Sequence, residues 1–220
     1  MKTNPTMRHF LLTLLLPAML LAGSTKGSDG SGVKATCTVT GVLINGVTWA
    51  TCNVDAFGTF AATPESYGMV YQWNRKTAWL STGVDPVSSP AGAMWDRSAP
   101  LGNEWSKAND PCPSGWRVPT QGQQTTLFES DKVERKWSTE KSVNGYRFTD
   151  KSSGNVVFFP AAGRRNGSDG TLDDAGGDGR YWSGSPGSSR RAWYLYVNSG
   201  YAYQYDGSRT YGFSVRCVRQ

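Results

Sequence analysis

The sequence predicts an α+β domain that is rich in loops, with short antiparallel strands and one or two helices. Three observations carry this prediction. Glycine is abundant, with 26 residues in 220, and many short apolar runs are separated by Gly, Asn, Asp and Pro. Clear helical periodicity is scarce. One segment, after Pro119, carries a well-formed helix start.

Several strand pairs follow from alternation of apolar residues and from turn signals. Residues 41–54 alternate and predict a hairpin that turns at Asn45-Gly46. Residues 145–149 and 155–160 predict a second strand pair. The aromatic-rich residues 67–79 are compatible with a strand or a short helix.

The helix start lies at Thr120, a plausible N-cap with Gln123 three residues on as its capping-box partner. We expect this helix to run to about Ser130, with Leu127 and Phe128 facing inward. The end of the chain then predicts four short strands, at residues 181–183, 192–198, 201–205 and 213–218.

The second and third of these strands, at residues 192–198 and 201–205, are rich in tyrosine. Six of the ten tyrosines fall between Tyr194 and Tyr211, mostly at every second residue. Alternate residues of a strand share a face, so each strand would present a row of phenols. Tyrosine with Ser, Gly and Arg is typical of antibody-like binding loops. The alternative is that these are ordinary strand residues, since Tyr favours sheets, but burying six phenols would require six hydroxyl partners.

The first 24 residues predict an export signal. Lys2 and Arg8 precede an apolar run at residues 10–21, which is short for a membrane span and ends in Ala22-Gly23-Ser24. We therefore expect an exported protein, secreted or at the bacterial cell envelope or surface, with no transmembrane span in the mature chain. It would be a lipoprotein if Ser24 replaces a natural Cys. Residues 25–33 predict a flexible linker, and residues 34–220 one domain.

Composition excludes several chemistries. The sole histidine, His9, lies in the export signal, so the mature chain would have no imidazole for a Ser-His-Asp or Cys-His site. Removing Lys2 and Arg8 lowers the formal net charge from +6 to +4. Because the positive charges are spread out and the chain is exported, nucleic-acid binding is not expected.

The four cysteines predict two structural disulfides in an oxidising compartment. Three pairings are possible, and we favour Cys37–Cys52 with Cys112–Cys217. A reactive thiol or a thiolate metal site is the alternative, although no C-x-x-C spacing supports a metal.

A loop rich in Gly and Asp covers residues 169–179. The carboxylates of Asp173, Asp174 and Asp178 could hold calcium, but the spacing does not match an EF-hand. We expect no cofactor and keep calcium as the alternative. Trp95 and Trp105 lie in an irregular segment and are interpreted as loop anchors rather than as a sugar-stacking platform.

Three sets of segments together resemble the Fibrobacter succinogenes major paralogous domain of Bacteroidetes surface proteins. They are residues 46–54 (Gly-Val-Thr-Trp-Ala-Thr-Cys-Asn-Val), residues 112–120 (Cys-Pro-Ser-Gly-Trp-Arg-Val-Pro-Thr), and residues 159–164 with 181–183 and 212–219. This resemblance implies a C-type lectin-like fold, shared with formylglycine-generating-enzyme relatives. The calcium-dependent sugar motif of animal lectins and the reactive cysteine pair of those enzymes are absent.

The tail is similar to variable proteins that bacterial diversity-generating retroelements diversify by changing adenines near the 3′ end of the gene. The closing residues 212–219 resemble the constant end of such repeats, and the resemblance implies a variable region at about residues 180–211. It implies that the variable residues are Ser188, Ser189, Arg190, Arg191, Tyr194, Tyr196, Tyr201, Tyr203, Tyr205, Asp206, Gly207, Ser208 and Tyr211. We expect the ligand-binding surface to consist of these residues without Gly207 and with Arg209 added.

Two main classes of function remain open. The first is a non-enzymatic, receptor- or adhesin-like protein that binds an unidentified protein or glycan on another cell or in the environment. Tyr194, Tyr196, Tyr203 and Tyr205 would be its anchors, and Arg190 or Arg209 its polar specificity contacts. The second is a carbohydrate-binding or carbohydrate-processing module that uses the Asp173, Asp174 and Asp178 loop. A structural subunit of the envelope is a third possibility.

Overall fold

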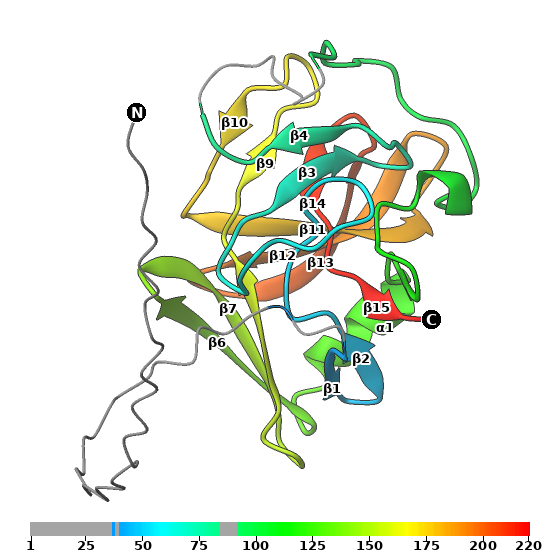
Figure 1. Ribbon diagram of the computed structural model, residues 1–220. Helices are drawn as coiled ribbons and strands as arrows, with labels where there is room; N and C mark the ends of the chain where they lie inside the picture. Colours follow the sequence, from blue (N-terminus) through cyan, green and yellow to red (C-terminus); the bar gives the residue numbers. More distant parts are fainter. Residues whose placement is uncertain (1–36, 38–39, 84–91) are drawn as a thin grey trace, which may run out of the picture. The chain divides into compact units, whose positions relative to one another are not determined.

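Antiparallel strands form most of the secondary structure, and one short α-helix accompanies them (Figure 1). The computed structural model describes Cys37, residues 40–83 and residues 92–220, which belong to one compact unit, Lys34–Gln220. The coarse expectation of a loop-rich α+β domain is confirmed. The predicted export signal and linker, residues 1–24 and 25–33, lie outside the described residues.

The first sheet joins the two ends of the described chain. Its strands are β1 (Val42–Ile44), β2 (Val47–Trp49), β15 (Val218–Arg219) and β5 (Trp116–Arg117), in the order β1-β2-β15-β5. The predicted turn between β1 and β2 is present. Asn45 and Gly46 have φ of 43° and 79°, the left-handed pair that a tight two-residue hairpin requires.

The largest sheet carries the C-terminal hairpin. Its main path runs β10-β9-β14-β11-β12-β13, with β3 paired to β14 and β4 paired to β3. The bounds are β3 (Met69–Gln72), β4 (Ala78–Leu80), β9 (Arg164–Arg165), β10 (Leu172–Asp173), β11 (Asp178–Pro186), β12 (Arg191–Asn198), β13 (Ala202–Ser208) and β14 (Gly212–Ser214). The open question over residues 67–79 is thus answered by two strands.

The third sheet consists of β6 (Val133–Glu140), β7 (Val143–Asp150) and β8 (Val156–Pro160). The predicted pair of strands corresponds to β7 and β8. Strand β6 was not predicted, because its sequence is dominated by charged and hydroxyl residues and only Val133 is fully buried.

Helix α1 (Gln121–Thr125) begins with the predicted capping box between Thr120 and Gln123. The expected extension to Ser130 is wrong, because a 3₁₀ turn, η2 (Thr126–Phe128), replaces it. The hydroxyls of Thr125 and Thr126 donate to backbone carbonyls one turn back, which weakens α-helix continuation. Leu127 is buried and Phe128 is half-buried, as expected. A second 3₁₀ turn, η1 (Lys107–Asn109), lies in the preceding loop.

Two main clusters of buried side chains lie on opposite faces of the large sheet. One cluster contains Leu195 and Val197 with Trp49 and Phe159, and the other contains Trp182 and Phe213. The two irregular-segment tryptophans are also buried, and their indole N–H groups donate to the carbonyls of Gly167 (from Trp95) and Asn109 (from Trp105). They act as loop anchors and offer no exposed platform.

The segment predicted as one strand at residues 213–218 is divided into β14 and β15. Between them Val215, Arg216 and Cys217 are all buried as the chain passes from the large sheet to the first sheet. The Arg216 guanidinium donates to Asn53 Oδ1 at 2.9 Å and to the carbonyls of Ala50 at 3.1 Å and Phe158 at 2.9 Å. This side chain therefore connects the segment between β14 and β15 to the segment after β2 and to β8.

Both favoured disulfides are present, Cys37–Cys52 and Cys112–Cys217. They fit an oxidising, exported environment. The only α-helix in the described part of the chain has five residues, so no helix there is long and apolar enough to cross a membrane.

The longer disulfide loop should contribute more to stability. Replacing Cys112 and Cys217 together with Ala removes a link across 105 residues and should lower the free energy of unfolding by about 4–5 kcal/mol. The matched control replaces Cys37 and Cys52, 15 residues apart, and should cost about 3 kcal/mol. Urea unfolding measures both. A larger loss for the Cys37 and Cys52 pair would contradict the expectation.

Candidate ligand-binding face

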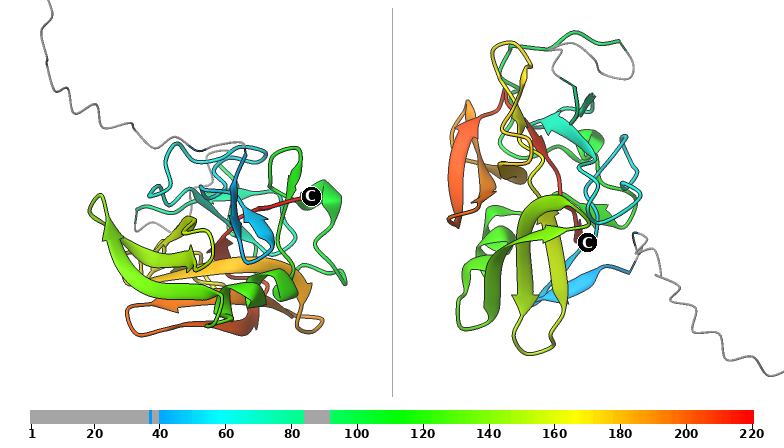
Figure 2. Two further views of the ribbon diagram at one scale, coloured as in Figure 1. Left: turned by 90° about the horizontal axis from the view of Figure 1, so that it is seen from below. Right: turned by 90° about the vertical axis from the view of Figure 1, so that its left-hand side faces the viewer.

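The pairing of β12 with β13 gathers the tyrosines on one side of the sheet. Tyr194 is directly opposite Tyr205, and Tyr196 is directly opposite Tyr203. Residues directly opposite in an antiparallel pair share a face, and so do residues two apart along a strand. These four tyrosines and Tyr201 therefore project from the same side of the hairpin, which lies at the outer side of the domain (orange in Figure 2, right).

The other side of the same hairpin faces the core. Leu195 and Val197 are fully buried, and Ala202 packs beside them. This alternation is the predicted one. It fixes which side of β12 and β13 carries the phenols.

The tyrosine rings form a continuous surface. The rings of Tyr194 and Tyr205 are 6.2 Å apart, those of Tyr196 and Tyr201 5.6 Å, and those of Tyr203 and Tyr205 5.2 Å, between centroids. Tyr201, Tyr203 and Tyr205 are 46%, 59% and 41% exposed, whereas Tyr194 and Tyr196 are half-buried. The tyrosines of β13 and the preceding turn are thus exposed, and those of β12 are partly packed against the protein.

Tyr211 extends this surface toward β14. Its ring stacks on Phe213 at 5.6 Å with an interplanar angle of 12°, and Phe213 also contacts Tyr194 at 4.7 Å. The Arg164 guanidinium lies 5.6 Å above the Tyr211 ring. We call Tyr194, Tyr196, Tyr201, Tyr203, Tyr205 and Tyr211 the tyrosine face.

Tyr196 of the tyrosine face differs from the buried Tyr71 and Tyr181 in the partners of its hydroxyl. The buried Tyr71 and Tyr181 donate to backbone carbonyls, of Asp55 and Pro160 respectively. On the face, Tyr196 donates to a side chain, Asp178 Oδ2, at 3.3 Å and accepts from Asn198 Nδ2 at 3.1 Å. Burial raises the pKa values of Tyr194 and Tyr196, and the neighbouring Tyr201 hydroxyl raises that of Tyr205.

An acidic loop borders the tyrosine face at the β11 side. Arg180 is directly opposite Tyr196, and its guanidinium lies 5.2 Å over that ring. Arg180 is also 2.8 Å from Asp178 and 3.3 Å from Asp174 in ion pairs. The predicted carboxylate cluster and the predicted tyrosines therefore meet at one site.

The carboxylates of this loop are paired with arginines. Arg164 contacts Asp173 at 3.4 Å and Asp174 at 3.8 Å. Burial raises the pKa of Asp178, Arg180 opposes this shift and the nearby charge of Asp174 adds to it, and the pKa is about 6 as a result. Within residues 37, 40–83 and 92–220, no group of three His, Cys, Asp or Glu side chains is placed to hold a metal ion.

Part of the predicted ligand-binding set lies on the opposite side of the hairpin. Arg191 is directly opposite Ser208, and Asp206 is directly opposite Trp193, so these residues alternate away from the tyrosines. Arg191 Nε is 2.8 Å from Asp206 Oδ2. Ser208 hydrogen-bonds Thr210 at 2.9 Å. These three residues and the tyrosines do not form one surface.

The loop before β12 carries three more predicted residues. Ser188, Ser189 and Arg190 are all exposed. Gly207, by contrast, packs under the tyrosine face, because a Cβ there would lie 3.0 Å from the Tyr194 ring. A side chain at position 207 would have to displace that ring.

Arg209 corrects the prediction of a polar specificity contact. It is only 1% exposed, because its guanidinium lies 4.0 Å over the Trp73 ring. It donates to the carbonyls of Ser188 at 2.6 Å, Gly102 at 2.8 Å and Pro100 at 3.1 Å, among others. Burial lowers its pKa. Arg209 therefore fixes the 188–191 loop to the scaffold and cannot offer its charge to a ligand.

Sequence reasoning missed two residues of the site, Arg164 and Arg180. Arg164 lies in the Phe159-to-Arg164 segment quoted for the family resemblance, and Arg180 follows directly after the acidic loop. The only available signal was that one arginine follows the acidic loop directly and the other lies five residues before it. No local pattern links either residue to the tyrosines.

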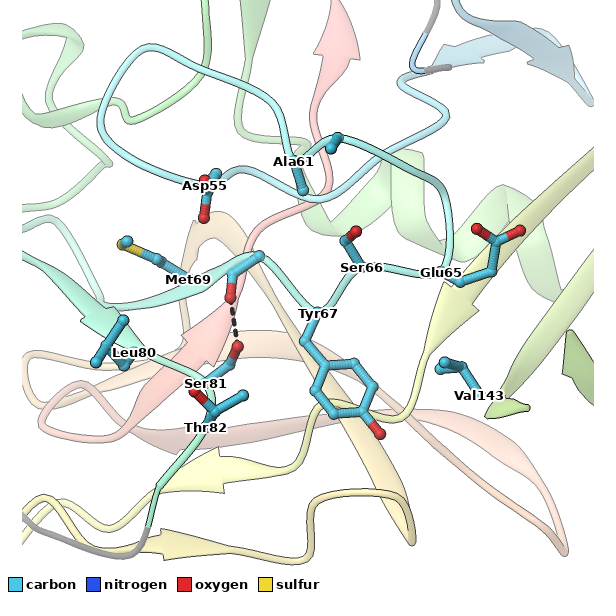
Figure 3. Close-up of a pocket in the computed structure, with 12 residues that line it drawn as sticks. Asp55, Ala61, Glu65, Ser66, Tyr67, Met69, Leu80, Ser81, Thr82 and Val143 are labelled. Carbon is cyan, nitrogen blue, oxygen red and sulfur yellow. Dashed lines mark hydrogen bonds between the residues drawn. The ribbon is translucent and has the colours of Figure 1, made fainter. Parts of the chain in front are cut away.

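A separate cavity of about 480 Å³ lies away from this face, lined partly by Asp55, Glu65 and Tyr67 (Figure 3). Figure 3 shows Asp55 and Glu65 at opposite ends, so they do not form a carboxylate pair. Glu65 contacts Lys141 at 3.0 Å, and although burial opposes it, this lysine lowers the carboxyl pKa. A carboxylate held ionised in this way does not favour general acid catalysis there.

One family model matches the chain, a domain of unknown function (DUF8237), over residues 132–218. The match covers β6 to the start of β15 and includes the acidic loop and the tyrosine face. No curated protein matches, and no solved structure matches.

The role of Arg209 can be tested against its exposed neighbour. Arg209→Met should lower the free energy of unfolding by about 2–4 kcal/mol, because it leaves several buried carbonyls without donors. Arg190→Met, the matched control, removes the same charge at an exposed position and should change it by less than about 0.5 kcal/mol. Chemical denaturation of both variants decides. Equal stability of the two would contradict the anchoring role.

Proposed function

We propose that this protein is a non-enzymatic, exported ligand-binding protein, receptor- or adhesin-like, whose tyrosine face binds a protein or glycan. The main support for this proposal is the row of tyrosines on β12 and β13. Their side chains are exposed along β13, and the opposite side of the same hairpin is apolar and buried. Tyrosine gives large and stiff contact area at low cost in side-chain entropy. A surface of this composition, held by a rigid sheet, is suited to recognition.

The chemistry of the surface supports an adaptable interface. The phenols are bordered by paired charges, Arg180 with Asp178 and Arg164 with Asp173, which can supply polar contacts at the rim. The exposed Ser188, Ser189 and Arg190 lie in the loop that Arg209 fixes in place. Of the four tyrosines predicted as anchors, we assign the main role to Tyr203 and Tyr205, because their side chains are the most exposed.

We further propose that the domain has a C-type lectin-like fold and that a diversity-generating retroelement varies its tail. Support comes from the resemblance of residues 46–54, 112–120 and 212–219 to Bacteroidetes surface domains. The division between side chains that hold the fold and side chains that do not gives the second support. Leu195, Val197 and Arg209 are buried, while Tyr203 and Tyr205 are not.

The display role can be tested by stability and selection. Replacing Tyr201, Tyr203 and Tyr205 together with Ser should lower the free energy of unfolding by less than about 1 kcal/mol, because the rings lie on the solvent side. Leu195→Ala, on the other side of the same hairpin, should cost about 2–5 kcal/mol. Urea unfolding measures both variants.

A library provides the functional half of this test. Randomising Tyr201, Tyr203 and Tyr205 on the yeast surface should yield folded variants that bind a chosen target, such as hen lysozyme. The control library randomises Leu195 and Val197 and should yield mainly unfolded chains. A serine triple variant that unfolds, or a face library that yields no binder, would overturn the proposal.

A second candidate function rests on one specific observation. The pKa of Asp178, raised to about 6 by burial, lies in the range of a general acid, and three aspartates gather in its loop. A carbohydrate-binding or carbohydrate-processing module would use these groups. The candidate is less well supported, because Arg164 and Arg180 already pair with the carboxylates.

The pH dependence of stability tests the environment of Asp178. The pKa of Asp178 is about 6 in the folded protein and 3.8, its ordinary value, in the unfolded chain. Between these two pH values the folded chain keeps this proton and the unfolded chain has lost it. The contribution of Asp178 to stability therefore falls as pH rises from about 4 to 6. Asp178→Asn should remove that fall, about 2 kcal/mol in the difference from the parent protein. Parallel curves of unfolding free energy from pH 4 to 7 would remove the support for the second candidate.

A further inference from the structure

A pocket of about 380 Å³ lies behind the β12–β13 hairpin, on the side away from the tyrosine face. It is enclosed by α1, η2, β6 and the two hairpin strands, and its walls include Phe128, Arg135, Trp193 and Gln204. Its volume falls within the range of about 300–1,000 Å³ that is usual for small-molecule sites. Tyr203 is the member of the tyrosine face that lines this pocket, and no residue of the acidic loop lines it.

Aromatic surface lines the pocket from two elements. Trp193 comes from β12 and Phe128 from η2, and Tyr203 contributes at the β13 edge. Trp193 lies on the same side of β12 as Leu195 and Val197, yet those two are fully buried and Trp193 is only half-buried. The indole is left partly uncovered because the pocket opens beside it. Such surfaces favour a flat or apolar ring.

A positive charge stands at the same pocket without a carboxylate partner. The Arg135 guanidinium lies 5.7 Å over the Phe128 ring. Arg75, Arg147, Arg164, Arg180 and Arg191 each form an ion pair, but Arg135 forms none with any carboxylate of the described chain. Arg135 lies two residues from the buried Val133 and so on the core side of β6.

The floor of the pocket is fixed before any ligand arrives. Gln204 Nε2 donates to the carbonyl of Gln121 at 2.9 Å, and Gln204 Oε1 lies 3.0 Å from Thr125 Oγ1. The Gln204 amide is thereby committed to the helix. Arg135 remains as the group that can bind an anion, and guanidinium binds carboxylate with two parallel hydrogen bonds.

We propose that this pocket binds a carboxylate carried on a six-membered ring, with the ring against Trp193 and Phe128 and the carboxylate on Arg135. Uronic acid residues of acidic glycans and aromatic acids share this chemistry. The site is independent of the tyrosine face, apart from the edge position of Tyr203.

Calorimetric titration of the intact protein tests the proposal with three probes: methyl glucuronide, benzoate, and uncharged methyl glucoside. At least one acid should bind, and the glucoside should bind at least about tenfold more weakly, because it lacks the charge that Arg135 pairs with. Binding of the glucuronide identifies a glycan source, and binding of benzoate alone identifies an aromatic source.

Two variants assign the binding to this pocket. Arg135→Gln should weaken the acid at least about tenfold. Lys136→Gln is the matched control, since it removes one positive charge from the exposed side of the same strand and should leave affinity unchanged. Trp193→Leu should also weaken binding, and thermal melts confirm that each variant is folded. Absence of binding by both acids, equal binding of the glucoside, or equal effects of Arg135→Gln and Lys136→Gln would overturn the proposal.

Discussion

The alternation of side chains along the β12–β13 hairpin is the constraint on which the site depends. Leu195, Val197 and Ala202 fill the core beneath it, and this fixes the register of the pair. A slip of one residue would turn every tyrosine inward and every core residue outward. The buried side therefore determines the exposed side. The proposed function therefore expects variation at the exposed Tyr201, Tyr203 and Tyr205, while the core residues stay unchanged.

Buried arginines supply the second part of the support. Arg216 is fully buried, and burial lowers its pKa to about 10, yet it has Asn53 and two backbone carbonyls as hydrogen-bond partners. Arg209 is also buried, and its guanidinium donates a hydrogen bond to the carbonyl of Ser188 in the loop before β12. Leaving such a group or its partners unpaired in the interior is costly, so these side chains favour one arrangement of loops and sheets. In this fold, which has few helices, the guanidinium groups of Arg209 and Arg216 hold loops in place by hydrogen bonds.

Local signals allowed part of the fold to be predicted. The Asn45-Gly46 turn, the Thr120 capping box and the alternation around Leu195 depend on residues close in sequence, and all three predictions are confirmed. The length of α1 and the existence of β6 could not be predicted in this way. Two threonines end the helix early, and β6 is recruited by pairing with β7 despite its polar sequence.

The candidate site shows the same limit. The tyrosine pattern was visible in the sequence, but its junction with the Asp178 loop depends on the pairing of β11 with β12. Arg209 has the same composition signal as Arg190, and only tertiary contacts with Trp73 and three loop carbonyls make one buried and the other exposed. Residue type predicted a face rich in tyrosine here, but not which arginines are exposed beside it.

The most direct measurement of the central claim is the DNA sequence beside this gene. The account predicts a near-copy of the 3′ end next to a reverse-transcriptase gene. Its adenine-containing differences should fall in codons of exposed residues such as Tyr203 and Tyr205. Codons for the buried Leu195 and Val197 should be unchanged. A flanking sequence without such a copy, or one whose differences fall equally on buried and exposed positions, would contradict it.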